Sequence, residues 1–158
     1  MRIVPLSLRV ANAFIAEYHR HSGLVRGHKF SIGLCDGDRL LGVAVVGRPL
    51  ARLLDDGSAA EIRRVCVRDG VPNGCSRLYA RARQICQLMG YERVFTYSLS
   101  SEGGGSLRAV GAVADREVGP HSGWSRQSRP RRSQPVDALA KVRWQLLSQP
   151  APPRGESA

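Results

Sequence analysis

The segment from Glu61 to Tyr97 constrains the fold more than any other part of this sequence. It begins with a β-rich run, passes through a loop rich in Gly, Pro and Asn, and then follows a helical pattern from about Cys75 to Met89. A second β-rich run, Tyr91–Tyr97, closes the segment. A strand, a helix and a strand in this order form a right-handed crossover, so the two strands are expected to be parallel.

The helix of this segment carries one apolar stripe, because its apolar residues recur at helical spacing. These residues are Leu78, Ala82, Ile85 and Met89. Gly90 follows them directly and can adopt the left-handed conformation that commonly ends a helix. The segment therefore predicts an amphipathic helix packed on one face of a sheet.

The rest of the chain predicts a mixed α/β fold. Ser7 can cap an N-terminal helix, and two β-rich runs around Asp36-Gly37-Asp38 predict a hairpin that ends before Pro49. A short helix (106–110) and two strands (113–118 and 139–147) follow. We expect an α/β (α+β) fold with a mixed, mostly antiparallel sheet, a central parallel pair and helices on both faces. Residues 1–148 would form one domain, and residues 149–158 a Pro-rich disordered tail.

The charge balance favours anionic partners. The chain has 24 Lys and Arg against 13 Asp and Glu, for a formal net charge of +11. Such an excess is typical of proteins that bind DNA, RNA or coenzyme phosphates. A general bias toward arginine is an equally good explanation. Clustering favours binding, because four arginines lie close together beside Trp124: Arg126, Arg129, Arg131 and Arg132.

Neither a membrane span nor a disulfide framework is expected. No apolar run approaches the ~18 residues that a membrane helix needs, and the N-terminus lacks the pattern of a signal peptide. The four cysteines show no spacing typical of a zinc site and are interpreted as reduced thiols: Cys35, Cys66, Cys75 and Cys86. We therefore expect a cytoplasmic protein without a metal. A site built from His19, His21 and His28 is conceivable, but its spacing is not diagnostic.

The loop before the central helix has the features of a phosphate site. Unpaired amides and the positive end of the dipole gather at a helix start and bind anions. Gly70 and Gly74 allow close approach of the main chain. Asn73 can cap the helix, and Ser76 offers a hydroxyl in its first turn. An ordinary strand-to-helix turn would show much the same pattern.

The order of elements resembles the GNAT acyltransferase superfamily. The resemblance spans roughly residues 3–147 and is most specific in Glu61–Val67, the loop that follows and Gly90-Tyr91. Shorter pieces resemble a phage- and prophage-associated branch related to the Mom DNA-modification proteins. These pieces are Gly27–Phe30, Gly47-Arg48-Pro49, Asn73–Ser76, Ser106–Ala109 and Lys141–Trp144.

The resemblance implies acyl-coenzyme A, such as acetyl-CoA, as the co-substrate. The main chain around Val65 and Val67 would pair with its pantetheine arm. A divergence of the strands after Tyr97 would give access for the acceptor amine. The pyrophosphate would be held by the loop after this strand, through Asn73 and the amides of Gly74, Cys75, Ser76 and Arg77.

Two features depart from the superfamily pattern. Its loop (Gln/Arg)-x-x-Gly-x-(Gly/Ala) is replaced here by Asp69–Gly74, and Leu107 stands where a Tyr usually protonates the coenzyme thiolate. Either another group supplies that proton or the domain binds without acetylating. By sequence, the nearest substitutes for the tyrosine are Tyr97, Ser98 and Cys75.

Three residues are candidates for catalysis: Glu61, Tyr97 and His28. An amine must lose a proton to act as a nucleophile, so a base is needed. Glu61 matches the region of the superfamily's usual base, although it could also be a solvated strand end paired to an arginine. His28 lies beside the acceptor side of the fold, where a histidine is more often a structural hydrogen-bonding group.

The candidates for binding the acceptor are basic or aromatic: Lys29, Arg48, Trp124 and Arg129. The leading hypothesis is an acyl-CoA-dependent N-acyltransferase acting on an amine of a nucleic acid, with adenine in DNA the sharpest case. Two alternatives stay open. One is acetylation of a small molecule, a protein terminus or an aminoacyl-tRNA, and the other is a non-catalytic nucleic-acid-binding protein on the same scaffold.

Overall fold

A computed structural model describes residues 1–18, 23–120 and 139–148. In these residues seven strands form one sheet in the order β1-β2-β3-β4-β5-β7-β6. The strands are β1 (Arg2–Leu6), β2 (Phe30–Asp36), β3 (Arg39–Gly47), β4 (Ala59–Val67), β5 (Arg93–Leu99), β6 (Val113–Val118) and β7 (Lys141–Ser148). The helices are α1 (Leu8–Tyr18), α2 (Gly74–Leu88) and α3 (Gly105–Ala109), with a 3-10 turn η1 (Arg52–Leu54).

The predicted parallel pair is confirmed. β4 pairs in parallel with β5, and α2 makes the crossover between them. The other neighbouring strands of this sheet run antiparallel. The sheet is therefore mixed and mostly antiparallel, as the sequence predicts.

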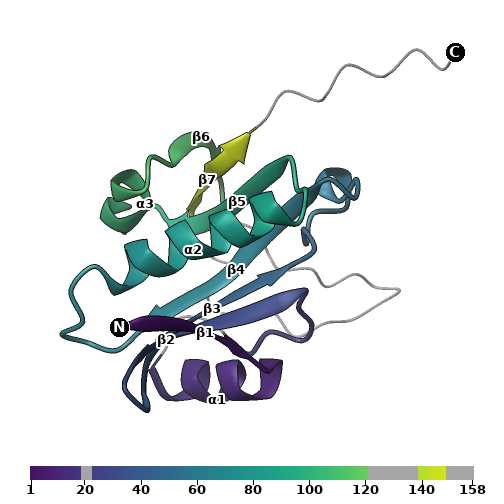
Figure 1. Cartoon of the computed structure of the whole chain (residues 1–158). Helices are drawn as coiled ribbons and strands as arrows, with labels where there is room; N and C mark the ends of the chain where they lie inside the picture. Colours follow the sequence, from purple (N-terminus) through teal and green to yellow (C-terminus); the bar gives the residue numbers. More distant parts are fainter. Residues whose placement is uncertain (19–22, 121–138, 149–158) are drawn as a thin grey trace, which may run out of the picture.

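The predicted helices on both faces are also confirmed, and Figure 1 shows α1 and α2 on opposite sides of the sheet. On the α1 side the buried core contains Phe14 and Ile15 of the helix with Val43 and Val45 of β3. On the α2 side it contains alternate residues of the same strands, such as Ala44 and Val46. The period-two alternation of a strand thus feeds two separate cores.

Local capping follows the sequence at the start of α1 and at the end of α2. Ser7 Oγ accepts a hydrogen bond from the Val10 amide at 3.3 Å. Gly90, directly after the C-terminal cap of α2, has φ +90°. The Tyr91 amide then donates to the Cys86 carbonyl, so β5 starts at Arg93, two residues later than predicted.

The sequence does not predict β1. This strand lies at the edge of the sheet and pairs only with β2, with Pro5 opposite Ile32. Proline lacks an amide proton and is tolerated only where no second partner strand needs it. The edge position explains how a short run with a proline still forms a strand.

Candidate functional site

The central parallel strands separate partway along their length. Their pairing ends at Glu61 opposite Phe95, although β4 continues to Val67 and β5 to Leu99. At the first position beyond, the buried hydroxyl of Thr96 donates to the Ile62 carbonyl at 2.7 Å. The divergence therefore begins after Phe95, two residues earlier than the predicted point after Tyr97. We call the space between the separating strands the opening.

A β-bulge in β4 directs charged side chains to the α1 side of the opening. Val45 lies opposite Arg64 and Val46 opposite Ile62, so Arg63 is an extra residue in the strand. Val45 belongs to the α1-side core, and its partner Arg64 faces the same way. Ile62 belongs to the α2-side core, so the preceding Glu61 also faces the α1 side.

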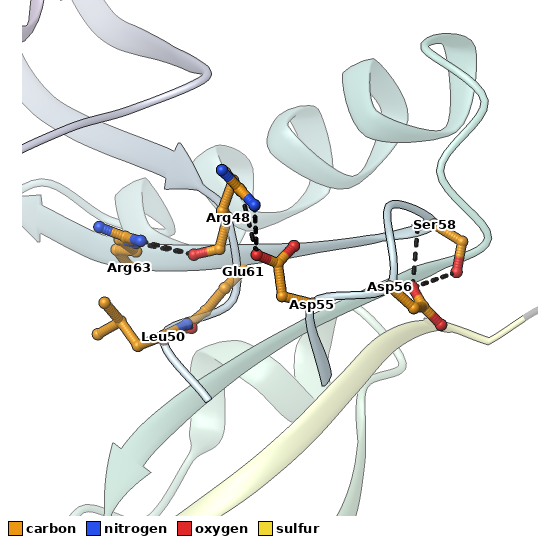
Figure 2. A network of polar contacts seen from close by, with 7 residues as sticks. All are labelled: Arg48, Leu50, Asp55, Asp56, Ser58, Glu61 and Arg63. Carbon is orange, nitrogen blue, oxygen red and sulfur yellow. Dashed lines mark hydrogen bonds and ion pairs between the residues drawn. The ribbon is translucent and has the colours of Figure 1, made fainter. Parts of the chain in front are cut away.

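Glu61 lies at the base of the opening and is buried, with 5% of its surface exposed. Its Oε2 accepts a hydrogen bond from the Leu50 amide at 2.9 Å, and Figure 2 shows the side chain reaching from β4 toward that loop. Burial raises the pKa of this carboxyl, although Arg63, Arg64 and Lys141 partly offset the effect. Glu61 is therefore not the solvated, arginine-paired strand end of the alternative interpretation.

The loop over Glu61 is fastened by polar contacts (Figure 2). Arg48 and Asp55 form an ion pair with Nη2 and Oδ2 2.8 Å apart. Arg63 donates to the Arg48 carbonyl at 2.6 Å through Nη2. The Asp56 carboxylate accepts from the amide and hydroxyl of Ser58, at 2.9 and 2.7 Å. These contacts hold the Leu50 amide in place against Glu61.

Tyr97 lies on the same side of the sheet as Glu61, two residues beyond Phe95. The rings of Tyr97 and Phe95 make an edge contact, with their centroids 5.8 Å apart. Burial and the Glu61 charge raise the pKa of Tyr97, while a hydrogen bond from Arg143 of β7 lowers it. The structure thus brings two of the three predicted catalytic candidates to one side of the opening.

The third candidate, His28, is exposed just before β2. Its Nδ1 lies 2.7 Å from the Ser31 hydroxyl. Lys29 is also exposed, with its ammonium 5.1 Å from the centroid of the Tyr91 ring. Arg48 is exposed but held by Asp55. Trp124 and Arg129 lie outside the described residues, as do His19 and His21.

A polar group that the sequence does not predict faces the opening from the α2 side. Tyr79 stands one helical turn after Cys75, and its hydroxyl lies close enough to the Thr96 side chain, at the base of the opening, for Thr96 to act on the Tyr79 pKa. Burial raises the pKa of Tyr79 well above its usual range. The only signal in the sequence is its spacing of four residues from Cys75, which also fits a core position.

The start of α2 presents open amides. Among the described residues, no group accepts a hydrogen bond from the amides of Cys75 and Ser76. The Arg77 amide donates to the Asn73 carbonyl at 3.0 Å, and the Gly74 amide contacts the Val71 carbonyl at 3.4 Å. Two of the four predicted phosphate-binding amides are therefore free for a ligand.

The side chains at the start of α2 make contacts that differ from the predicted ones. Asn73 makes no side-chain cap and instead adopts a left-handed conformation with φ 57°, which asparagine tolerates. The Ser76 hydroxyl donates to the Asn73 carbonyl at 3.0 Å. Burial raises the pKa of Cys75, so a reactive thiolate is not favoured. Arg77 is exposed, with Nη1 3.3 Å from the Met1 sulfur.

Gly74 is required by the close approach of α2 to β4. A Cβ at this position would meet Val67 Cγ1 at 2.6 Å. We expect Gly74→Ala to lower the free energy of unfolding by about 1–3 kcal/mol, the usual cost of overpacking. Gly105→Ala is the matched control, since a Cβ at this position of α3 would meet nothing within 4 Å. Chemical denaturation of both variants measures the difference, and equal stability would contradict the packing argument.

Leu107, at the position of the superfamily tyrosine, is buried with 2% of its surface exposed. Trp144 of β7 is also buried, and its indole donates to the Ser98 hydroxyl at 2.9 Å. Both residues belong to the α2-side core. Neither side chain is therefore exposed to the opening as a polar group.

A hollow of about 530 Å³ lies between β1 and the outer side of α2, away from the opening. Arg77, Arg81 and Arg83 are among its lining residues. In the described residues, no helix is both long and apolar enough to cross a bilayer. The same residues contain no group of three or more His, Cys, Asp or Glu side chains placed to hold a metal ion.

The sequence matches no protein-family model and no curated protein. Solved structures, however, share its fold. The ribosomal-protein-S18-alanine N-acetyltransferase of Escherichia coli is 12% identical with a TM-score of 0.66, over 97% of each chain. The yncA protein of Salmonella typhimurium, solved with its cofactor acetyl-CoA, is 11% identical with a TM-score of 0.66, over 98% of each chain. An acetyltransferase of the GNAT family from Streptococcus pneumoniae is 9% identical with a TM-score of 0.64, over 93% of this chain and 98% of that chain.

At these identities the likeness establishes the fold, and the predicted GNAT fold is confirmed. These structures give no support to a phage-associated or Mom-related branch, so that assignment stays a prediction. The activity and the acceptor must be argued from the opening and its residues.

Proposed function

We propose that this chain transfers an acyl group from acyl-coenzyme A to an amine. One observation carries the proposal: the opening between β4 and β5 has a carboxyl, Glu61, at its base on one side and a phenol, Tyr79, on the other. Acyl transfer to an amine needs a base for the amine proton and is assisted by a proton donor for the leaving thiolate, and this gap has one of each.

The chain has features that fit the donor. Beyond Glu61 the edge of β4 that faces β5 has no partner strand among the described residues, so its main chain can pair with an amide-bearing arm. The free amides of Cys75 and Ser76 lie just beyond the end of this strand, where a pyrophosphate can bind. Acetyl-CoA bound to the similarly folded Salmonella typhimurium protein supports the same donor here.

The reaction assigns a task to each side of the opening. The amine nitrogen bonds to the thioester carbonyl carbon, and Glu61 takes the proton that the nitrogen loses, directly or through water. The carbon–sulfur bond breaks, and the Tyr79 hydroxyl gives its proton to the departing thiolate. Tyr79 is protonated at neutral pH, as an ordinary phenol is, and burial raises its pKa further. It thus supplies the proton for which the sequence offered Tyr97, Ser98 or Cys75.

Binding of acetyl-CoA, measured by calorimetry, is the first test. We expect Arg77→Ala to weaken binding about three- to tenfold, the size of one partly exposed charge-assisted contact. Arg81→Ala is the matched control, because Arg81 is an exposed arginine one turn further along α2, bonded to Gln84 at 2.8 Å. Failure of the unaltered chain to bind acetyl-CoA would overturn the proposed function.

A nucleic-acid amine as the acceptor is a second candidate, favoured by the net charge of +11. The most specific version of this candidate has adenine in DNA as the acceptor. Incubation with acetyl-CoA and duplex DNA, followed by mass spectrometry of the nucleosides, tests it directly. Salt-sensitive DNA binding without binding of acetyl-CoA would instead indicate the non-catalytic alternative.

A further inference from the structure

The α1 side of the opening carries more positive than negative charge. Two strands, β4 and β7, contribute four cations to it: Arg63, Arg64, Lys141 and Arg143. Of the carboxylates among the described residues there, Asp115 is bound to Arg143, at 2.8 and 3.0 Å. The other, Glu61, is buried and bonded to a main-chain amide.

Arg64 is a half-buried cation that forms no direct ion pair within the described residues, although the Glu61 carboxyl is close enough to act on its charge. Its Nη1 donates to the Arg63 carbonyl at 2.7 Å, and its Nη2 lies 3.5 Å from the Gly23 carbonyl. Its Nε is buried and has no hydrogen-bond partner. No carboxylate of the described residues forms an ion pair with it. Partial burial of a guanidinium without an ion pair costs free energy, so a bound anion would stabilise it.

Lys141 supplies a second such cation from another strand. It lies opposite Leu99 in β5, toward the wide end of the opening, and it is half-buried. Within the described part of the chain it forms no ion pair. Its charge, like that of Arg64, acts on the Glu61 carboxyl. The two cations therefore lie on β4 and β7, on the same side of the opening, and both act on the carboxyl at its base.

We infer that the acceptor is a compact amine carrying a carboxylate or phosphate group, which Arg64 and Lys141 bind while Glu61 takes the proton of the amine. The inference rests on the proposed acyl transfer and names its substrate class. An anion at this position neutralises the two cations and orients the amine toward the donor. A polyamine would instead meet uncompensated positive charge. Half-buried cations beside a single carboxyl suit one anionic group better than a long polyanion.

Pairs of acceptors that differ only in the anion provide the test. In the unaltered chain kcat/KM for O-phosphoethanolamine should exceed that for ethanolamine by about tenfold or more, the effect of one buried charge-assisted contact. The same ratio is expected for β-alanine over β-alaninamide, and comparison of the two pairs separates phosphate from carboxylate. Equal rates within both pairs, or transfer to duplex DNA but to none of the small amines, would overturn the inference.

Two variants locate the anion. Arg64→Met and Lys141→Met should each reduce the preference for the anionic over the neutral acceptor about tenfold. The change should lie mainly in KM of the acceptor. Arg39→Met is the matched control, because Arg39 is exposed at the hairpin end of β3. Loss of the preference in Arg39→Met, or its survival in both other variants, would contradict the assignment. Thermal unfolding checks that each variant is folded.

A binding measurement separates this inference from the proposed function. Titration of the chain with O-phosphoethanolamine, without acetyl-CoA, is followed by NMR. Binding that is lost in Arg64→Met and Lys141→Met supports the anion site even if no acyl transfer occurs, and then only the proposed function fails. Absence of binding overturns the anion site, even if neutral amines are acetylated.

Discussion

Replacing Glu61 by glutamine should lower kcat for acyl transfer by about a hundredfold or more, the usual contribution of a general base. The affinity for acetyl-CoA should not change. Glutamine keeps the size of the side chain and an oxygen that can accept from the Leu50 amide, whose present bond to Glu61 is 2.9 Å long. It cannot take a proton from the amine. Single-turnover kinetics and calorimetry on the same preparation measure the two quantities.

The pH dependence gives an independent readout of the same group. Burial raises the pKa of Glu61 in the folded chain, so the ionised base forms only as the pH rises through that elevated value. The rate should therefore rise with pH, along a limb above the usual range of a glutamate, and Glu61→Gln should lack this limb. The contribution of Glu61 to the free energy of unfolding changes with pH in the opposite direction to the rate. The fold favours the protonated carboxyl, so Glu61 contributes stability at low pH that is lost as the pH rises through the folded pKa.

Glu117→Gln is the control, because Glu117 is exposed on β6. It should leave both the rate and its pH profile unchanged. If Glu61→Gln turned over as fast as the unaltered chain, Glu61 would not be the base. The carboxyl would then serve only to hold the loop at Leu50.

The hairpin, the crossover, the Ser7 cap of α1 and the end of α2 could be predicted because their signals are local. The Asp36-Gly37-Asp38 turn fixes β2 against β3, and φ at Gly90 follows directly from the end of α2. The alternation of Val43, Ala44 and Val45 likewise determines which side chains enter which core. These patterns involve residues that are close together in the sequence, so they can be recognised without knowing which distant segments pair.

The geometry of the opening could not be predicted, because it depends on pairing between distant segments. The extra residue at Arg63 is defined only by its register against β3, and the end of pairing at Glu61 only by β5. The burial of Glu61 depends on Leu50, which lies eleven residues away in a loop with no periodic pattern. The sequence thus indicated Glu61 as a candidate but not the environment that raises its pKa.

Tyr79 illustrates the same difficulty. A tyrosine on a helix is more often a core residue than a proton donor, and Tyr79 also packs against the α2-side core. What distinguishes it is the contact with Thr96, seventeen residues further along the chain and on another element. Only the fold brings that hydroxyl to the base of the opening.

Replacing Tyr79 by phenylalanine should lower kcat by about a hundredfold, the order expected for loss of a general acid. KM for acetyl-CoA should hardly change, because the ring and its packing remain. Thr96 keeps its 2.7 Å bond to the Ile62 carbonyl, so the strands should separate as before. Steady-state kinetics with varied acetyl-CoA measure both parameters, and thermal unfolding confirms that the variant is folded.

Two further tyrosines make the experiment specific. Tyr91→Phe is the control for loss of a hydroxyl outside the opening, and it should retain full kcat. Tyr97→Phe tests the rival donor on the α1 side, where the hydroxyl is engaged by Arg143. A donor must face the sulfur as the carbon–sulfur bond breaks. If Tyr97→Phe abolished turnover and Tyr79→Phe did not, the proton would come from the side of Glu61, and the two-sided arrangement proposed here would be wrong.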